Sequence, residues 1–264
     1  MTNEKTHETI GEEIEEFIEE LPSHKKFDPL VGHPKRNAIL AVMCLSLIVI
    51  VLDNSILNVA IPTISRDLQA TDQQLLWVID AYTLVFAGLL LTAGTLGDKY
   101  GRRLLLQIGL GIFGIASIVA AFADSPTQLI AGRALMGIGG ACIMPSTLSI
   151  ITNVFPPKER AKAIGIWSAF AGIGVAIGPL TGGFLVEHFW WGSVFLVNIP
   201  VVLFGIGANA TIVPESRAEK SEKVDYIGAG LSIIGLSSLL YGIIFGAYEG
   251  FTEDKDSPIR MACQ

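Results

Sequence analysis

The sequence Gly94-Thr-Leu-Gly-Asp-Lys-Tyr-Gly-Arg-Arg103 joins two apolar segments and places three cations and one carboxylate in a short turn. Leu75–Ala93 precedes it and Leu104–Ala123 follows it, and Asp80 is the only charged residue in these two segments. Each segment is long enough to cross a bilayer core of roughly 30 Å as an α-helix. Short turns rich in Lys and Arg stay in the cytoplasm. The sequence therefore predicts two transmembrane helices joined by a cytoplasmic turn.

The composition is that of a membrane protein in contact with lipid. Apolar residues make up 51% of the chain, charged residues 16%, and the mean hydropathy is +0.55. Soluble domains carry about 25% charged residues. The net charge of −7 argues against a nucleic-acid partner. The histidines lack metal-ligand spacing, so no metal site is predicted.

Catalytic and cofactor-binding arrangements are not recognised in the sequence. The sequence contains no recognisable arrangement of a nucleophile with a base, and no phosphate-binding loop. We therefore expect that the protein is not an enzyme and needs no cofactor. Gly109-Leu-Gly-Ile-Phe-Gly114 matches the dinucleotide-binding glycine pattern, but it lies inside an apolar segment without a preceding strand and is rejected.

Seven apolar segments have about the twenty or more residues that a transmembrane helix needs. Helices are expected because non-helical backbone facing lipid is too costly. The predicted spans are Ala38–Ile61, Leu75–Leu96, Leu104–Ala123, Gln128–Val154, Ala161–Val186, Val194–Val213 and Ile227–Ala247.

Cations alternate between the connecting segments and so predict the orientation. The cation-rich segments contain Lys25, Lys26, Lys35 and Arg36; Lys99, Arg102 and Arg103; Lys158, Arg160 and Lys162; and Arg217, Lys220 and Lys223. The opposite segments contain only Arg66. This bias predicts a multi-pass protein of the cell membrane with a cytoplasmic N-terminus.

Three polar segments flank or interrupt the spans. Residues 1–35 contain apolar side chains at helical spacing between glutamates, which fits a solvated amphipathic helix or a segment that docks a partner. Residues 214–226 form a short cytoplasmic linker and residues 248–264 a polar tail. Transporters are commonly built from two repeated halves, so we expect a chain of seven spans to be a truncated form or a fragment.

Two intramembrane acids are candidates for proton or substrate chemistry. Asp53 lies in Leu52-Asp-Asn-Ser-Ile-Leu-Asn-Val-Ala-Ile-Pro62, at bilayer depth, where a carboxylate costs about 2.5–3.5 kcal/mol. It is interpreted either as a reversible proton carrier or as a structural acid paired with a neighbouring helix. Asp80 is shallower, and Trp77 and Tyr82 beside it could stack on a flat organic cation or anchor the helix at the interface.

The fourth span contains a basic residue followed by small residues. Arg133, Gly137 and Ala141 are four residues apart and share one helix face, which leaves room for a neighbouring helix. A buried guanidinium stays charged and favours the ionised form of a nearby acid, or it forms a purely structural bridge.

The fifth span and the basic turn suggest conformational roles. Gly174, Gly178 and Gly182 share one face, with Pro179 and Gly183 beside them, which fits a flexible contact or a plain packing face. In the turn, Asp98 is a candidate partner of Arg160 in a weak cytoplasmic latch; alternatively, the turn only fixes the topology.

These motifs resemble those of the major facilitator superfamily of transporters, and among them the drug:proton antiporters with fourteen spans. The resemblance covers about residues 36–250, with departures at Ser55, where threonine is usual, and Met136, where glutamine is frequent. The short segment 214–226 is similar to that of the fourteen-span group. It implies that residues 36–213 form the N-terminal six-helix half and residues 227–247 an extra linker helix.

The resemblance implies proton-driven export of organic, cationic or amphipathic compounds, with the proton gradient as energy source and a second half in the full-length protein. It implies that Asp53 and Arg133 couple protons and that Asp80, Trp77 and Tyr82 take part in substrate binding or coupling. The residues implied in gating are Gly94, Asp98, Gly101, Arg102, Arg103, Arg160, Gly174, Gly178, Pro179, Gly182 and Gly183. An inactive remnant, an interacting half-subunit and, less favoured, a solute symporter are the alternatives.

Overall fold

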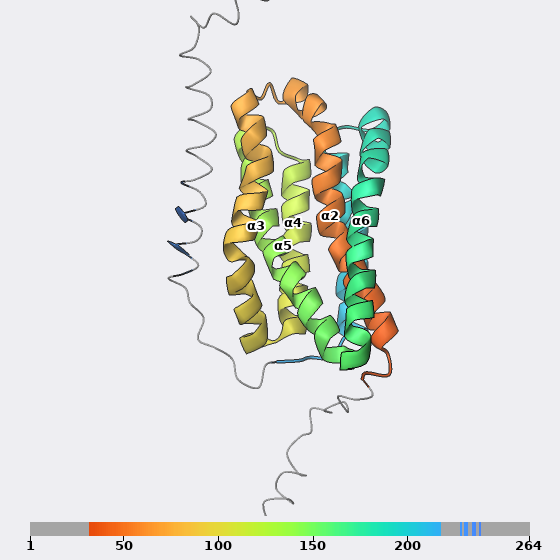
Figure 1. Ribbon diagram of the computed structural model, residues 1–264. Coiled ribbons are helices and arrows are strands. Elements are labelled where there is room, and N and C mark those ends of the chain that lie inside the picture. Colours follow the sequence, from red (N-terminus) through yellow and green to blue (C-terminus); the bar gives the residue numbers. More distant parts are fainter. Residues whose placement is uncertain (1–31, 218–227, 229, 232–233, 236–237, 239–264) are drawn as a thin grey trace, which may run out of the picture.

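The computed structural model describes residues 32–217 and, further along the chain, residues 228, 230, 231, 234, 235 and 238. The regular elements of this part are helices that run along an elongated bundle (Figure 1). The helices are α2 (Arg36–Asp67), α3 (Asp72–Tyr100), α4 (Arg102–Ala121), α5 (Pro126–Val154), α6 (Pro157–His188), α7 (Ser193–Leu196) and α8 (Asn198–Ile212).

Six helical segments of the described part are long and apolar enough to cross a membrane, with α7 and α8 counted together as Ser193–Ile212. This finding confirms the prediction of an all-α polytopic membrane protein. The first six predicted spans coincide with these segments, although several helices continue into the polar ends; α2, for example, continues beyond Ile61 to Asp67.

The sixth predicted span differs from a single helix, because it is divided at Val197 into α7 and α8. Pro200 lies in the first turn of α8, where its missing N–H is tolerated. Its ring would clash with the carbonyl group four residues earlier, at Leu196, if one helix continued through this point.

Several predicted segments lie outside the described residues. They are residues 1–31 of the polar extension, residues 218–226 of the linker, the tail 248–264, and most of the seventh predicted span, Ile227–Ala247. The interpretations of these segments stay predictions.

Residues at the ends of the helices fix where the chain turns. Thr71 and Gln74 form a reciprocal capping box at the start of α3. Ser125 caps α5 through the backbone N–H of Gln128, 3.3 Å away. Gly101 separates α3 from α4 with a φ of +125°, a conformation in which a side chain would be strained.

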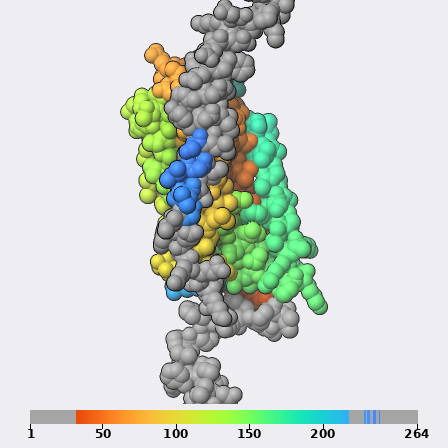
Figure 2. All heavy atoms as spheres, turned by 60° about the vertical axis from the view of Figure 1, so that its left-hand side comes forward, coloured from red at the N-terminus to blue at the C-terminus, as the bar shows by residue number. Residues whose placement is uncertain are grey.

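The packing places α5 between α3 and α4, and places α2 against α6 and α8. Gly109 of α4 faces Gly139 of α5 so closely that a Cβ atom on Gly109 would lie 2.9 Å from the carbonyl oxygen of Gly139. The glycine pattern around Gly109 therefore serves helix packing. Along one edge of the molecule, α6 presents exposed apolar side chains such as Leu180 and Phe184 (Figure 2).

The contact between α4 and α5 can be tested with two glycines of the same helix. We expect Gly109→Val to destabilise the bundle by about 1–3 kcal/mol, because the added side chain overpacks the interface. Gly111→Val is the matched control, since a Cβ atom there meets nothing within 4 Å. Thermal unfolding in detergent measures both variants, and equal melting temperatures would contradict the assigned packing role.

Candidate functional site

The centre of the candidate site is an ion pair between Asp53 of α2 and Arg133 of α5. The exposed fraction of the side chain is 1% for Asp53 and 0% for Arg133, so the pair is buried inside the bundle. Asp53 lies near the middle of α2, far from both helix ends. The geometry therefore brings together the two residues that the sequence singled out for proton coupling.

The guanidinium of Arg133 has further partners on α2, α3 and α5. It donates to the carbonyl oxygen of Val78 and to the side-chain oxygen of Asn54, each at 3.1 Å, and contacts the sulfur of Met136 at 3.9 Å. The centre of the Tyr82 ring lies 4.4 Å from the guanidinium carbon. Guanidinium groups bind aromatic faces in this way. Arg133 therefore keeps several partners besides Asp53.

The second oxygen of the Asp53 carboxylate has a partner that sequence reasoning missed. Nδ2 of Asn198, the first residue of α8, donates to Oδ1 of Asp53 at 2.9 Å and makes a longer contact of 3.4 Å with Oγ of Ser117. Asn198 is 1% exposed and Ser117 0% exposed. The one signal in the sequence was an amide side chain inside a predicted apolar span.

The three residues predicted to act on the substrate are not gathered in one place. Tyr82 is 3% exposed and is stacked under Arg133, a position that neither predicted role described. Trp77 and Asp80 are only partly buried, and Asp80 makes no ion pair with any described residue. Residues two apart on a helix do not share a face, which separates Asp80 from Tyr82.

The glycines of α6 lie against α2, as their common spacing predicted. Cβ atoms on Gly174 and Gly182 would lie 3.2 Å from side-chain atoms of Val51 and Ile56, respectively. Gly178 meets Ser55 still more closely. Gly183, in contrast, has nothing within 4 Å of its Cβ position, so this glycine takes no part in the contact.

Pro179 and Ser55 form a second link between α2 and α6. Because Pro179 has no N–H, the carbonyl group of Val175, four residues earlier, loses its helical donor. The hydroxyl group of Ser55 donates to that carbonyl oxygen at 2.9 Å. A proline in one helix is thus accommodated by a side chain of the helix that holds Asp53.

The basic turn between α3 and α4 is held by the segment that follows α8. The N–H of Arg102 donates to the carbonyl oxygen of Ser216 at 3.0 Å, and the N–H of Arg103 donates to the carboxylate of Glu215 at 3.2 Å. A Cβ atom on Gly101 would lie 2.6 Å from the same carboxylate. In Figure 1 this segment is the extended blue stretch of chain that crosses the lower end of the bundle.

The predicted pairing of Asp98 with Arg160 is wrong for the described structure. Asp98 pairs instead with Arg102, four residues along the chain, at 2.8 Å. The side chain of Arg160 donates to the carbonyl oxygen of Phe155 at 3.1 Å. The ion pair that reaches the start of α6 is formed by Arg36 and Glu159, at 2.9 Å. Gly94, the first residue of the basic motif, lies on α3. A Cβ atom on Gly94 would lie 3.8 Å from the Cβ atom of Pro145, which is an ordinary contact.

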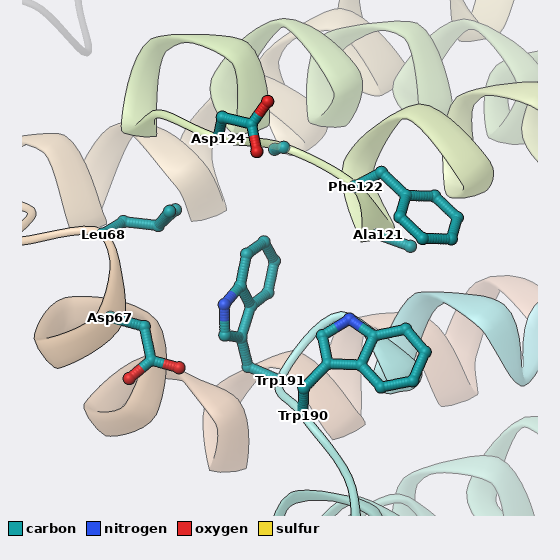
Figure 3. A pocket seen from close by; sticks show the side chains of 8 residues that line it. Asp67, Leu68, Ala121, Phe122, Asp124, Trp190 and Trp191 are labelled. Carbon is teal, nitrogen blue, oxygen red and sulfur yellow. The ribbon is translucent and has the colours of Figure 1, made fainter.

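A cavity of about 610 Å³ lies at the end of the bundle that is away from the basic turn, and the buried ion pair takes no part in its lining. Figure 3 shows the indole rings of Trp190 and Trp191 in this cavity, with the carboxylates of Asp67 and Asp124 at its sides. Asp67 is the last residue of α2, whereas Asp124, Trp190 and Trp191 lie in connections between helices. None of the predicted site residues lines this cavity.

Comparison with known proteins identifies the family. Residues 43–251 match the Major Facilitator Superfamily. The chain belongs to the major facilitator superfamily. Membership of this transporter family agrees with the expectation that the chain is not an enzyme. A crystal structure of the peptide transporter POT has the same fold, with a TM-score of 0.62, 14% identity, and coverage of 82% of this chain and 46% of that chain.

The similar superfamily members include proteins of drug resistance. The methyl viologen resistance protein SmvA of Salmonella typhimurium is 43% identical over 203 residues, which are 76% of this chain and 41% of SmvA. The multidrug efflux pump LfrA of Mycolicibacterium smegmatis is 41% identical over 214 residues, which are 81% of this chain and 42% of LfrA. The chain therefore spans about two fifths of the length of these relatives.

Because the ion pair is buried, we expect the stability of the protein to depend on Asp53 and Arg133 being present together. We expect Asp53→Asn or Arg133→Met alone to lower the free energy of unfolding by about 3–5 kcal/mol, because one buried charge is left unpaired. The double variant should lose less than the sum of the two. Asp98→Asn is the control, since its more exposed pair should contribute only about 0–1 kcal/mol. Unfolding in detergent measures the cycle, and additive effects would refute the coupling.

The hydrogen bond from Ser55 to α6 gives a separate prediction. Ser55→Ala leaves the carbonyl oxygen of Val175 without a donor and should cost about 1 kcal/mol of stability. Ser55→Thr keeps a hydroxyl group and should retain the wild-type melting temperature. If both variants melt alike, the hydroxyl group does not stabilise the helix that contains Pro179.

Proposed function

We propose that this chain supplies the N-terminal half, residues 36–213, and a linker helix, residues 227–247, of a proton-coupled antiporter that exports organic compounds. The observation that carries the proposal is the buried pair of Asp53 and Arg133, because ionisable groups inside a membrane bundle mark ion and proton pathways. The relatives SmvA and LfrA bear names of drug resistance and efflux, which supports export.

Asp53 is the proton carrier in this proposal. Its carboxylate is ionised while it pairs with Arg133 and gains a proton when the pair separates. Arg133 keeps its charge throughout, since a guanidinium does not lose its proton in proteins. After separation, the carbonyl oxygen of Val78, the amide of Asn54 and the ring of Tyr82 remain as its partners. The cluster thus tolerates both protonation states.

The substrates in this proposal are organic cations and amphipathic compounds. One relative, SmvA, is named for resistance to methyl viologen. Asp80 is a carboxylate on α3 without an ion-pair partner in the described part of the chain, so it remains free to attract a cation. Substrate binding also requires the surface of the second half, because transporters of this kind bind between their repeated halves.

The orientation in this proposal has the N-terminus in the cytoplasm and the protein in the cell membrane. One end of the bundle holds Arg36, Arg103 and Arg160, whereas Arg66 lies near the other end. The bias of Lys and Arg toward the first end supports this orientation. In this proposal, the glycines of α6 that pack against α2, together with the exposed Pro179, let the helices rock relative to each other.

Efflux from membrane vesicles tests the proposal, with the chain joined to a second half. An imposed proton gradient should drive export of a cationic dye, and Asp53→Asn should reduce export to the level of vesicles without the protein. Asp67→Asn is the matched control, because this acid lies on the same helix but is exposed at its end.

Two results would contradict the proposal. Normal gradient-driven export by Asp53→Asn would remove this residue from the proton path. Export by the wild type that continues after the proton gradient is abolished would remove proton coupling itself. Absence of export with any second half would instead favour an inactive remnant or an interacting half-subunit.

A further inference from the structure

Asn198 is buried against Asp53 and belongs to none of the motifs that suggested the function. Its Nδ2 atom donates to Oδ1 of Asp53, while Arg133 occupies the other carboxylate oxygen, Oδ2. The side chain comes from α8, a different helix from those of Asp53 and Arg133. Two donors thus hold the two oxygens of one carboxylate.

The other end of the same amide is unsatisfied. Oδ1 of Asn198 is buried and has no hydrogen-bond partner among the described residues. A buried acceptor without a donor is unfavourable, so such an atom calls for an explanation. An amide can also turn by half a revolution at little steric cost, because its oxygen and its NH₂ group have nearly the same size.

Among the described residues, Asn198 is the one partner of the carboxylate that can act either as donor or as acceptor. Arg133 only donates, whatever the state of Asp53. A proton on Oδ1 of Asp53 would point at the NH₂ group of Asn198, placing donor against donor. A half-turn of the amide replaces this repulsion by a bond from the carboxyl O–H to the unpartnered Oδ1 of Asn198.

We infer that Asn198 is a positioning residue for proton exchange, and that its amide turns when Asp53 gains or loses its proton. With Asp53 ionised, Nδ2 donates to the carboxylate; with Asp53 protonated, the carboxyl group donates to Oδ1 of the amide. One proton enters from water and the site gains one positive charge, with no other bond made or broken covalently. The inference rests on the proposed role of Asp53.

The other groups around Asp53 are less suited than Asn198 to change between donor and acceptor. Among the described residues, Arg133 of α5 is the charged partner of Asp53, and the titratable Tyr82 of α3 lies against Arg133. From α8, the uncharged Asn198 contacts Asp53, and the uncharged Ser117 of α4 contacts Asn198. Ser117 already donates its hydroxyl hydrogen to the carbonyl oxygen of Phe113 at 2.8 Å, so it is less free to reverse.

Nuclear magnetic resonance on the 264-residue chain in detergent tests the inference, with ¹³Cγ-labelled aspartate and ¹⁵Nδ2-labelled asparagine. The Asp53 resonance is assigned by its loss in Asp53→Asn, and the Asn198 resonance by its loss in Asn198→Leu. We expect both resonances to shift with pH around one common midpoint. In Asn198→Leu, the Asp53 midpoint should move to higher pH by about one unit, because a bond to the ionised form outweighs a bond to the neutral form.

Asn209→Leu is the matched control for loss of an amide from α8. Asn209 is also buried with an unpartnered Oδ1, but its Nδ2 donates to the carbonyl oxygen of Arg103, at the far end of the helix. This variant should leave the Asp53 midpoint unchanged. If Asn198→Leu does not fold, the Asn198 resonance is assigned by its loss in Asn198→Gln, which keeps an amide but carries no labelled asparagine at this position. The common midpoint of the Asp53 and Asn198 resonances in the wild type then still decides the question.

The outcomes separate the inference from the proposed function. An Asp53 resonance that does not titrate in the wild type would refute the proposed proton carrier. An Asp53 resonance that titrates while the Asn198 resonance stays constant would overturn the role of Asn198 alone. The same holds if Asn198→Leu and Asn209→Leu move the Asp53 midpoint equally.

Discussion

The fold depends on the need to neutralise charges inside an apolar bundle. Asp53 and Arg133 are both almost completely buried, and a charge left without its partner there is destabilising. Their contacts draw in Val78 and Tyr82 from α3 and Asn198 from α8. The ion pair and its partners therefore join four helices, α2, α3, α5 and α8, at one point.

Two helices connect this pair to more distant parts of the chain. Asn198 begins α8, and near the other end of that helix Asn209 binds the backbone of Arg103 in the basic turn. On the other side, α2 carries both Asp53 and Ser55, and Ser55 binds the carbonyl group that Pro179 leaves free in α6. Small side chains on α6 allow this close approach. The helices α2 and α8 thus connect the buried pair to α6 and to the basic turn.

The sequence predicted the helices and singled out Asp53 and Arg133 separately, because both predictions follow from the cost of polar groups in lipid. Apolar length indicated the spans, and Asp53 and Arg133 were conspicuous as charges inside them. The sequence did not predict Asn198 as a partner of Asp53, since residues 145 positions apart meet only through tertiary packing. Asp98 was paired with the wrong arginine although Arg102, four residues away, offered the simpler helical spacing. The bond between Arg36 and Glu159 had no local signal at all.

The central claim is that the ion pair of Asp53 and Arg133 opens when Asp53 is protonated. Structures of the protein determined at two pH values, on either side of the protonation of Asp53, test it most directly. The account predicts an intact pair at the higher pH and, at the lower pH, a guanidinium that has left the carboxyl group for its other partners. An unchanged pair in a protein shown to have protonated Asp53 would contradict the account.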